Sequence, residues 1–205
     1  MNFKYKLQRF LRKIAIPNLM YIICFAQGLV FVADLITQGK FTWSMAFDRA
    51  AIMSGEVWRL LTFIFLPINT NPFWIVITIL FYISVGRTVE NAWGADKLTH
   101  FILIDWLLTI AVGFIFGWAI NYFIFLSLIL VYGTICPREQ VNLYMVLPIE
   151  VRWLAIAYGI ILVVNIILGN MCAIPPIITY LLFFGKDEIF RPLYQKIKFK
   201  RMFKQ

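Results

Sequence analysis

The sequence predicts an all-α polytopic membrane protein that crosses the bilayer six times. Of its 205 residues, 62% are apolar and only 14% are charged, and the mean hydropathy is +0.83. These values lie far outside the balance of soluble domains. A helix needs about 20 apolar residues to cross about 30 Å of hydrocarbon. Six segments approach this requirement, near residues 17–37, 72–90, 98–118, 121–136, 151–169 and 172–185. They form one membrane domain, residues 15–186, and leave no room for a soluble one.

The distribution of basic residues predicts that both chain termini are cytoplasmic. The formal net charge is +9, and the basic residues concentrate in residues 1–14 and 187–205. With six crossings, only Lys40, Arg49 and Arg59 fall on the opposite side of the membrane. This asymmetry follows the positive-inside rule. Because no aromatic stacking pattern or recognition motif accompanies the charge, we expect membrane lipids, and not nucleic acid, as partners of the basic tails.

The N-terminal half begins with an interfacial segment and a single span. Residues 1–14 alternate basic and apolar residues at helical spacing, which predicts an interfacial helix. After the first span comes the longest loop, residues 38–71, which is too apolar to be fully exposed to water. We therefore expect short helices that lie within the outer leaflet. The loop ends with a charged and aromatic cluster, Glu56, Trp58 and Arg59. We expect Trp58 to anchor the loop at the headgroups and Arg59 to bind phosphate there.

The later spans carry small residues and prolines at informative positions. The fourth and sixth segments have only about 14–16 residues, so they are expected to lie in a thinned bilayer or inside the bundle. Gly113 and Gly117 form a G-x-x-x-G step, which predicts close packing between helices of this chain, or else a dimer contact. Pro175 and Pro176 are expected to kink or shorten the last span.

Polar residues inside the spans are candidate functional residues. Asp105 lies several residues deep in the third span, where an acidic side chain needs a partner. Its candidate donors are Asn165, Asn121, Thr109 and Tyr158. Either an internal polar lock between helices or a proton or ion pathway would explain it. At the end of the second span, Gly86 precedes Arg87 and Glu90, whose i, i+3 spacing predicts an ion pair.

The order of these features resembles the rhomboid-like superfamily. The resemblance rests on a loop ending in Glu-x-Trp-Arg, a second span that closes on GRTVENAWG (residues 86–94), a short fourth span and the connection CPREQVNLYMVLPIEVRWLA (residues 136–155). It covers about residues 55–170. It implies a six-helix rhomboid-like bundle with a membrane-embedded first loop and a strand-like piece after the fourth span. Short bacterial rhomboid-like proteins and Derlins are the expected relatives, which implies a bacterial plasma membrane.

The catalytic elements of rhomboid proteases do not match this chain. The family's Gly-x-Ser-Gly nucleophile would fall near Tyr122, and no such motif occurs. The last span contains no His, and the positions of the oxyanion-stabilising His-x-x-x-Asn fall on Trp74 and Thr78. The resemblance therefore implies a pseudoprotease that binds transmembrane segments of client proteins, lipids, or both, with Glu56, Trp58, Arg59 and Trp74 as contact residues.

Two alternatives remain open at this stage. The first is a protease with a displaced nucleophile, Ser127, but the only histidine, His100, is expected to lie about 10 Å or more away along the membrane normal. The second is a small proton-coupled transporter that uses Asp105. No cofactor motif or metal cluster is expected, because Cys24, Cys136 and Cys172 lie singly in or beside spans and are predicted to be apolar packing residues.

Overall fold

The structure, a computed structural model, describes residues 15–143 and 147–185. The predictions for residues 1–14 and 187–205 therefore lie outside the described residues. Within them, six apolar helices of ten or more residues follow one another along the chain. They are α2 (Leu19–Thr37), α6 (Pro72–Trp93), α7 (Ala95–Phe116), α8 (Tyr122–Ile135), α9 (Val151–Ile167) and α10 (Ile174–Phe184).

Three of these helices, α2, α6 and α7, are long and apolar enough to cross a membrane. The helices α8, α9 and α10 have 14, 17 and 11 residues. The predicted shortness of the fourth and sixth apolar segments is therefore confirmed. A 3-10 turn, η2 (Met171–Ala173), precedes α10. Pro175 and Pro176 lie in the first turn of α10, so of the two expected effects they mark the start of a short helix and do not kink its interior. Residues in the first turn lack intrahelical acceptors for their N–H groups, so proline is tolerated there.

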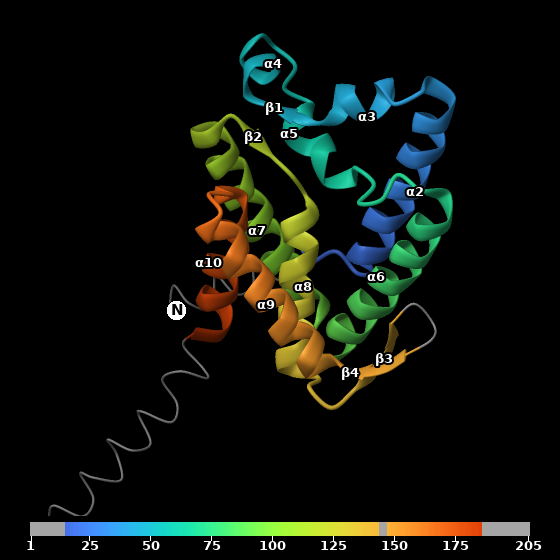
Figure 1. Cartoon of the computed structure of the whole chain (residues 1–205), viewed down its shortest axis with the longest axis vertical. Helices are drawn as coiled ribbons and strands as arrows, with labels where there is room; N and C mark the ends of the chain where they lie inside the picture. Colours follow the sequence, from blue (N-terminus) through green and yellow to red (C-terminus); the bar gives the residue numbers. More distant parts are fainter. Residues whose placement is uncertain (1–14, 144–146, 186–205) are drawn as a thin grey trace, which may run out of the picture.

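The first loop folds into short helices, as predicted. These are α3 (Lys40–Met45), α4 (Arg49–Met53), α5 (Arg59–Thr62) and the 3-10 helix η1 (Phe63–Phe65). Between them, β1 (Phe47–Asp48) pairs antiparallel with β2 (Trp118–Ala119), which follows α7. In Figure 1 this loop covers one end of the helix bundle, which we call the loop end.

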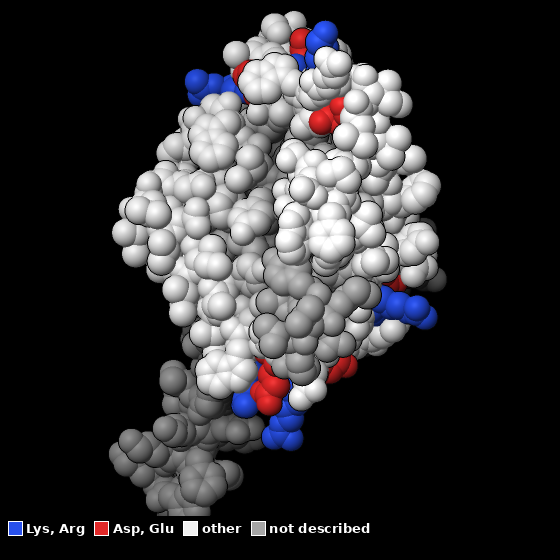
Figure 2. Space-filling model, turned by 45° about the vertical axis from the view of Figure 1, so that its right-hand side comes forward, with Lys and Arg blue, Asp and Glu red and all other residues white. Residues whose placement is uncertain are grey.

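The opposite end, which we call the hairpin end, carries a β-hairpin between α8 and α9. It consists of β3 (Gln140–Leu143) and β4 (Leu147–Glu150), which pair antiparallel. The predicted strand-like piece after the fourth apolar segment is therefore confirmed. Figure 2 shows that charged side chains gather near the two ends of the molecule on this face and leave an uncharged band between them. Such a band is what lipid hydrocarbon requires.

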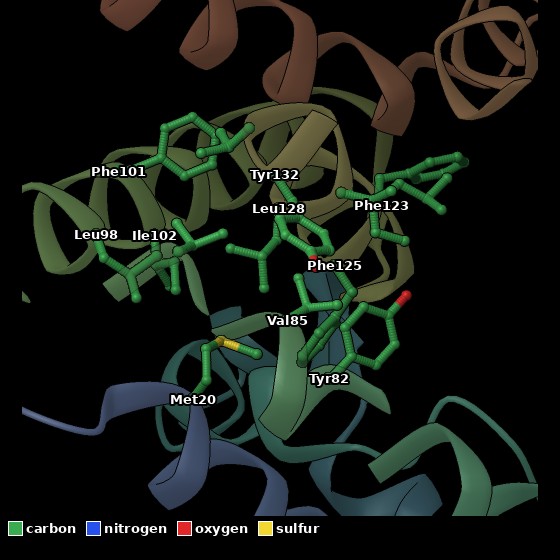
Figure 3. Close-up of a cluster of buried hydrophobic side chains, with 14 of the residues drawn as sticks. Met20, Tyr82, Val85, Leu98, Phe101, Ile102, Phe123, Phe125, Leu128 and Tyr132 are labelled. Carbon is green, nitrogen blue, oxygen red and sulfur yellow. The ribbon is translucent and has the colours of Figure 1, made fainter. Parts of the chain in front are cut away.

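The core lies where α2, α6, α7 and α8 meet. Met20, Val85, Phe101 and Leu128 are buried there, one from each of these helices, and they point toward one another (Figure 3). The helix α8 supplies ten buried residues in its 14 and lies at the centre, with α6, α7, α9 and α10 against it. Its apolar side chains face protein on all sides. A helix surrounded in this way has no need of full bilayer length on a lipid-facing surface.

Small residues set the closest helix contacts. A Cβ at Gly86 would overlap the side chain of Met20, so α6 and α2 approach closely there. At Gly133, a Cβ would overlap the side chain of Ala155, which brings α8 against α9. The two glycines of the G-x-x-x-G step do not form the helix–helix contact that was predicted. Gly113 packs against the loop, where an added Cβ would lie only 2.8 Å from the ring of Phe47, whereas Gly117 ends α7 at a φ of 97°.

Candidate functional site

The loop is held together by the guanidinium of Arg59. Its Nε donates to Glu56 Oε2 at 2.6 Å, and one terminal nitrogen donates to the carbonyl oxygens of Trp43 at 2.7 Å and Ala46 at 2.9 Å. The other terminal nitrogen lies 2.6 Å from the same Glu56 oxygen. Only 8% of Arg59 is exposed. These bonds use most of the guanidinium donors inside the protein, and the phosphate contact of Arg59 stays a prediction. The arginine joins α3 to α5.

The tryptophans of the predicted contact set lie at the surface. Trp58 is 54% exposed, and its Nε1 donates to the carbonyl oxygen of Ser44 at 3.3 Å. Trp74 lies in the first turn of α6, is partly exposed, and packs edge-on against Phe73 with 5.4 Å between ring centroids. The indole of Trp58 combines an exposed apolar body with a satisfied polar tip, which suits a position at the headgroups.

Two amide side chains support the irregular backbone after η1. Asn121 Nδ2 donates to the carbonyl oxygens of Ile64 at 3.2 Å and Leu66 at 2.7 Å. Gln27 Nε2 donates to the same Leu66 oxygen at 3.0 Å. Both amides are buried. Non-helical backbone is costly in hydrocarbon unless protein groups satisfy it, and these amides do so where the loop turns toward α6.

Asp105 joins three helices through its carboxylate. Ser127 of α8 donates to Oδ2 at 2.6 Å, and Thr179 of α10 donates to Oδ1 at 3.4 Å. All three side chains are completely buried. We call this group the polar lock. It connects α7, α8 and α10 inside the bundle. Of the two roles expected for Asp105, a polar lock between helices and a proton or ion pathway, these contacts are those of the lock.

None of the predicted donors to this carboxylate is the actual one. Asn121 donates to backbone carbonyl oxygens of the loop. Asn165 donates to the carbonyl oxygen of Ile161 in its own helix at 2.8 Å. Thr109 donates to the backbone oxygen of Asp105 at 2.8 Å, not to its carboxylate. Tyr158 lines a groove on another side of the bundle. Sequence distance gives no information on helix rotation, so the true donors, Ser127 and Thr179, were missed.

The predicted Arg87–Glu90 ion pair is also wrong. The two ion pairs among the described residues join Arg59 to Glu56 and Arg152 to Glu150. Both carboxylate oxygens of Glu90 instead accept from the backbone N–H of Asn18, at 2.9 and 3.1 Å. Glu90 thus stabilises the start of α2, one turn along α6 from the close contact at Gly86.

Ser127 and His100 have separate partners. Besides Asp105, Ser127 Oγ lies 2.7 Å from the carbonyl oxygen of Ile124. His100 Nδ1 contacts the carbonyl oxygen of Asp96, one turn earlier in α7. A serine nucleophile needs a base within about 3 Å and access to substrate. The described partners of Ser127 are instead those of a buried structural hydroxyl.

A groove of about 640 Å³ opens between α6 on one side and α8 and α9 on the other. In Figure 2, which brings this side forward, a furrow runs along the centre of the face. Hydroxyl, amide and carboxylate groups line the groove together with apolar side chains. The polar lining residues are Asn69, Thr78, Tyr82, Ser84, Thr88, Tyr122, Tyr132, Glu139, Gln140 and Tyr158.

Polar contacts are fixed at both ends of the groove. Near the loop end, Asn69 Nδ2 donates to Thr78 Oγ1 at 2.7 Å, and this hydroxyl donates to the carbonyl oxygen of Trp74 at 2.8 Å. Near the hairpin end, the Tyr132 hydroxyl donates to Glu139 Oε2 at 2.6 Å. Of the predicted contact residues, only Trp74 lies next to this groove. Glu56 and Arg59 bind each other in the loop.

The rhomboid-like resemblance implies a side groove that receives a transmembrane helix, but the residues that line this groove were not predicted from the sequence, although a signal exists. In the second apolar segment, Thr78, Ser84 and Thr88 interrupt the apolar run, and Ser84 and Thr88 have the i, i+4 spacing of one helix face. Small hydroxyl residues at that spacing are typical of helix-contact faces in membranes. Glu139 belongs to the connection after the fourth segment but was not predicted as a site residue. Among the described residues, no group of three or more His, Cys, Asp or Glu side chains could hold a metal ion.

The comparisons with known proteins support an integral membrane protein. The model of a family described as "Eukaryotic integral membrane protein (DUF1751)" matches residues 18–185, nearly all of the described chain. No curated protein and no solved structure matches the chain. The family's description conflicts with the expected bacterial origin, so the prediction of a bacterial plasma membrane is corrected. Because the match covers well over half of the sequence, this chain belongs to the DUF1751 family of eukaryotic integral membrane proteins.

Proposed function

We propose that this protein is a catalytically inactive, rhomboid-like membrane protein whose groove binds transmembrane segments of client proteins. The observation that carries the proposal is the groove between α6 and α8–α9, whose polar side chains lie within an otherwise uncharged part of the molecule. In this proposal all six apolar helices cross the membrane and both termini face the cytosol, so that the hairpin end is cytosolic.

The position of the groove favours a ligand that is itself in the membrane. Its lining runs along α6 from Ile77 to Thr88, a distance of about 16 Å at 1.5 Å per residue. This is about half of the hydrocarbon thickness. A water-soluble ligand could reach the groove only from its ends, because the rest of the lining lies in the uncharged band. A transmembrane helix reaches the same surface by lateral diffusion.

The chemistry of the groove favours a helix over a lipid chain. Acyl chains cannot use hydroxyl and amide groups, whereas a helix with Ser, Thr, Asn or Gln in its span can hydrogen-bond to them. Such contacts contribute about 0.6 to 2 kcal/mol each in membranes. A client helix with weakly apolar residues would therefore bind better than one made of leucine. This preference suits an adaptor or quality-control factor.

The order of elements supports the rhomboid-like part of the proposal. A first apolar helix precedes a loop of short helices closed by Arg59, and a buried short helix, α8, lies at the centre of the bundle. The polar lock supports the inactive part. Ser127, the candidate displaced nucleophile, is fully buried and bound to Asp105. The same bonds hold Asp105 in a structural role, so no observation favours a transporter.

The test is site-specific photo-crosslinking in native membranes. A photoreactive phenylalanine analogue replaces Phe81, which lines the groove, and in a matched variant it replaces Val76, an exposed residue of the same helix outside the groove lining. We expect crosslinks to membrane proteins from position 81 and mainly to lipid from position 76. Equal protein crosslinks at both positions, or lipid adducts alone at both, would refute the proposal.

A further inference from the structure

The groove has a single charged side chain among the described residues that line it. This is Glu139, at the hairpin end, beside Gln140 and Val141 of β3. The other lining residues are apolar or carry hydroxyl and amide groups. The basic residues of this end, Arg87, Lys97, Arg138 and Arg152, do not belong to the lining. The groove therefore ends in one negative charge.

The position of Glu139 is fixed by both its backbone and its side chain. Its N–H donates to the carbonyl oxygen of Cys136 at 3.2 Å, and its own carbonyl oxygen accepts from the N–H of Val151 at 2.9 Å. These bonds tie it to the end of α8 and the start of α9. The hydroxyl of Tyr132, a buried residue, holds carboxylate oxygen Oε2 at 2.6 Å. The carboxylate is thus oriented by the core while the residue remains exposed.

The charge of Glu139 is not neutralised by another side chain of the described part of the protein. The nearest basic residue on α9, Arg152, is 2.6 Å from Glu150 and also lies over the ring of Trp153. Within residues 15–143 and 147–185, Glu139 forms no ion pair. Tyr132 is a neutral donor. A cation supplied by a bound partner would therefore complete this site.

We infer that the groove selects transmembrane helices that carry a lysine or arginine immediately after their cytosolic end, where it pairs with Glu139. This inference rests on the proposed function and names the class of client. Single-pass proteins commonly have basic residues at this position, because the positive-inside rule places them there. A helix seated along α6 with its polar face toward Ser84 and Thr88 brings such a residue to the end of the groove. Glu139 binds the charge, and Tyr132 acts as the positioning residue.

The test uses the full chain co-expressed with single-pass reporter proteins in eukaryotic membranes. The reporters share one apolar helix and differ only in the first residue after its cytosolic end, which is Lys, Gln or Glu. Their orientation is fixed by a signal peptide and a glycosylated luminal domain. Crosslinking from position 81 of the groove measures binding. For a partly exposed pair we expect about fivefold more crosslinking of the Lys reporter than of the Gln reporter, and less still of the Glu reporter.

Variants of the carboxylate identify the residue responsible. We expect Glu139→Gln to remove the preference and Glu139→Lys to reverse it in favour of the Glu reporter. Tyr132→Phe should reduce the preference for the Lys reporter, because the carboxylate loses the hydroxyl that orients it. The matched control is Glu150→Gln, because Glu150 is a carboxylate of the same hairpin that already binds Arg152. It should leave the preference unchanged. Expression level and the protease-resistant core of each variant verify folding.

The outcomes separate the inference from the proposed function. If no reporter crosslinks from position 81, the proposed groove function fails. If all three reporters crosslink equally, clients bind but the selection by charge is wrong. If a folded Glu139→Gln protein still prefers the Lys reporter, Glu139 is not the residue that binds the lysine, and the inference is overturned. Loss of the preference in Glu139→Gln but not in Glu150→Gln supports it.

Discussion

At the scale of single residues, the polar side chains of this protein serve structure more often than contact with ligands. Arg59, Asn121 and Glu90 each satisfy backbone groups of another segment. Asp105 does the same for hydroxyls of two other helices. In hydrocarbon, an unsatisfied polar group costs several kcal/mol, so each such side chain must find a partner inside the protein. The pairs then specify which helices meet.

The polar lock gives a direct prediction at this scale. Replacing Ser127 with Ala removes the 2.6 Å bond to Asp105 and leaves a buried carboxylate oxygen without its donor. We expect a loss of about 1–2 kcal/mol in the free energy of unfolding. Thermal unfolding of the purified protein in mild detergent measures it.

The control for this experiment is Ser84→Ala, which removes an exposed hydroxyl from α6 outside the lock. It should leave the unfolding midpoint unchanged. If Ser127→Ala is as stable as Ser84→Ala, the bond to Asp105 contributes nothing, and Asp105 must be stabilised in another way.

At the scale of elements, close helix contacts depend on glycines that the apolar pattern does not distinguish. The contact of α8 with α9 shows the difference between two glycines on one interface. A Cβ at Gly133 would overlap Ala155 and lie 3.3 Å from the carbonyl oxygen of Val151, whereas a Cβ at Gly159 would lie at an ordinary 3.6 Å from Leu130. Only the first position requires the absence of a side chain.

This difference predicts opposite outcomes for the same substitution. We expect Gly133→Ala to destabilise the protein by about 1–3 kcal/mol, because backbone must move to admit the methyl group. Gly159→Ala should be neutral or stabilising by up to about 1 kcal/mol, because alanine is the better helix former. Unfolding midpoints of the two variants, measured side by side, check the prediction. Equal effects would mean that α8 and α9 are farther apart than described.

At the scale of the whole molecule, the proposed topology, in which all six apolar helices cross the membrane, predicts that the two ends face opposite compartments. Three helices, α6, α7 and α8, lie between the loop residue Met53 and the hairpin-end residue Arg138. If all three cross, as the proposal holds, their odd number puts these two residues on opposite sides of the membrane.

Cysteine labelling tests this topology. In a variant without Cys24, Cys136 and Cys172, a single cysteine replaces either Met53, which is highly exposed, or Arg138. In sealed microsomes we expect a membrane-impermeant maleimide to label Arg138→Cys directly and Met53→Cys only after permeabilisation. Labelling of both before permeabilisation would show that one of the three helices does not cross.

The sequence by itself determined the membrane class, the approximate bounds of the apolar helices and the short-helix character of the loop, while the strands after α8 were implied by the rhomboid-like resemblance. These features depend on the local run of apolar residues, on proline and glycine, and on the burial requirement that hydrocarbon imposes on backbone. Only the tertiary structure decided that Arg59 is internal, that Ser127 and Thr179 bind Asp105, that Glu90 binds Asn18, and that a groove ends at Glu139. Such contacts depend on how each helix is rotated and tilted against its neighbours. When apolar residues occur on every face of a helix, the hydropathy pattern does not show which face packs against which neighbour. The rotation of each helix therefore cannot be predicted from it.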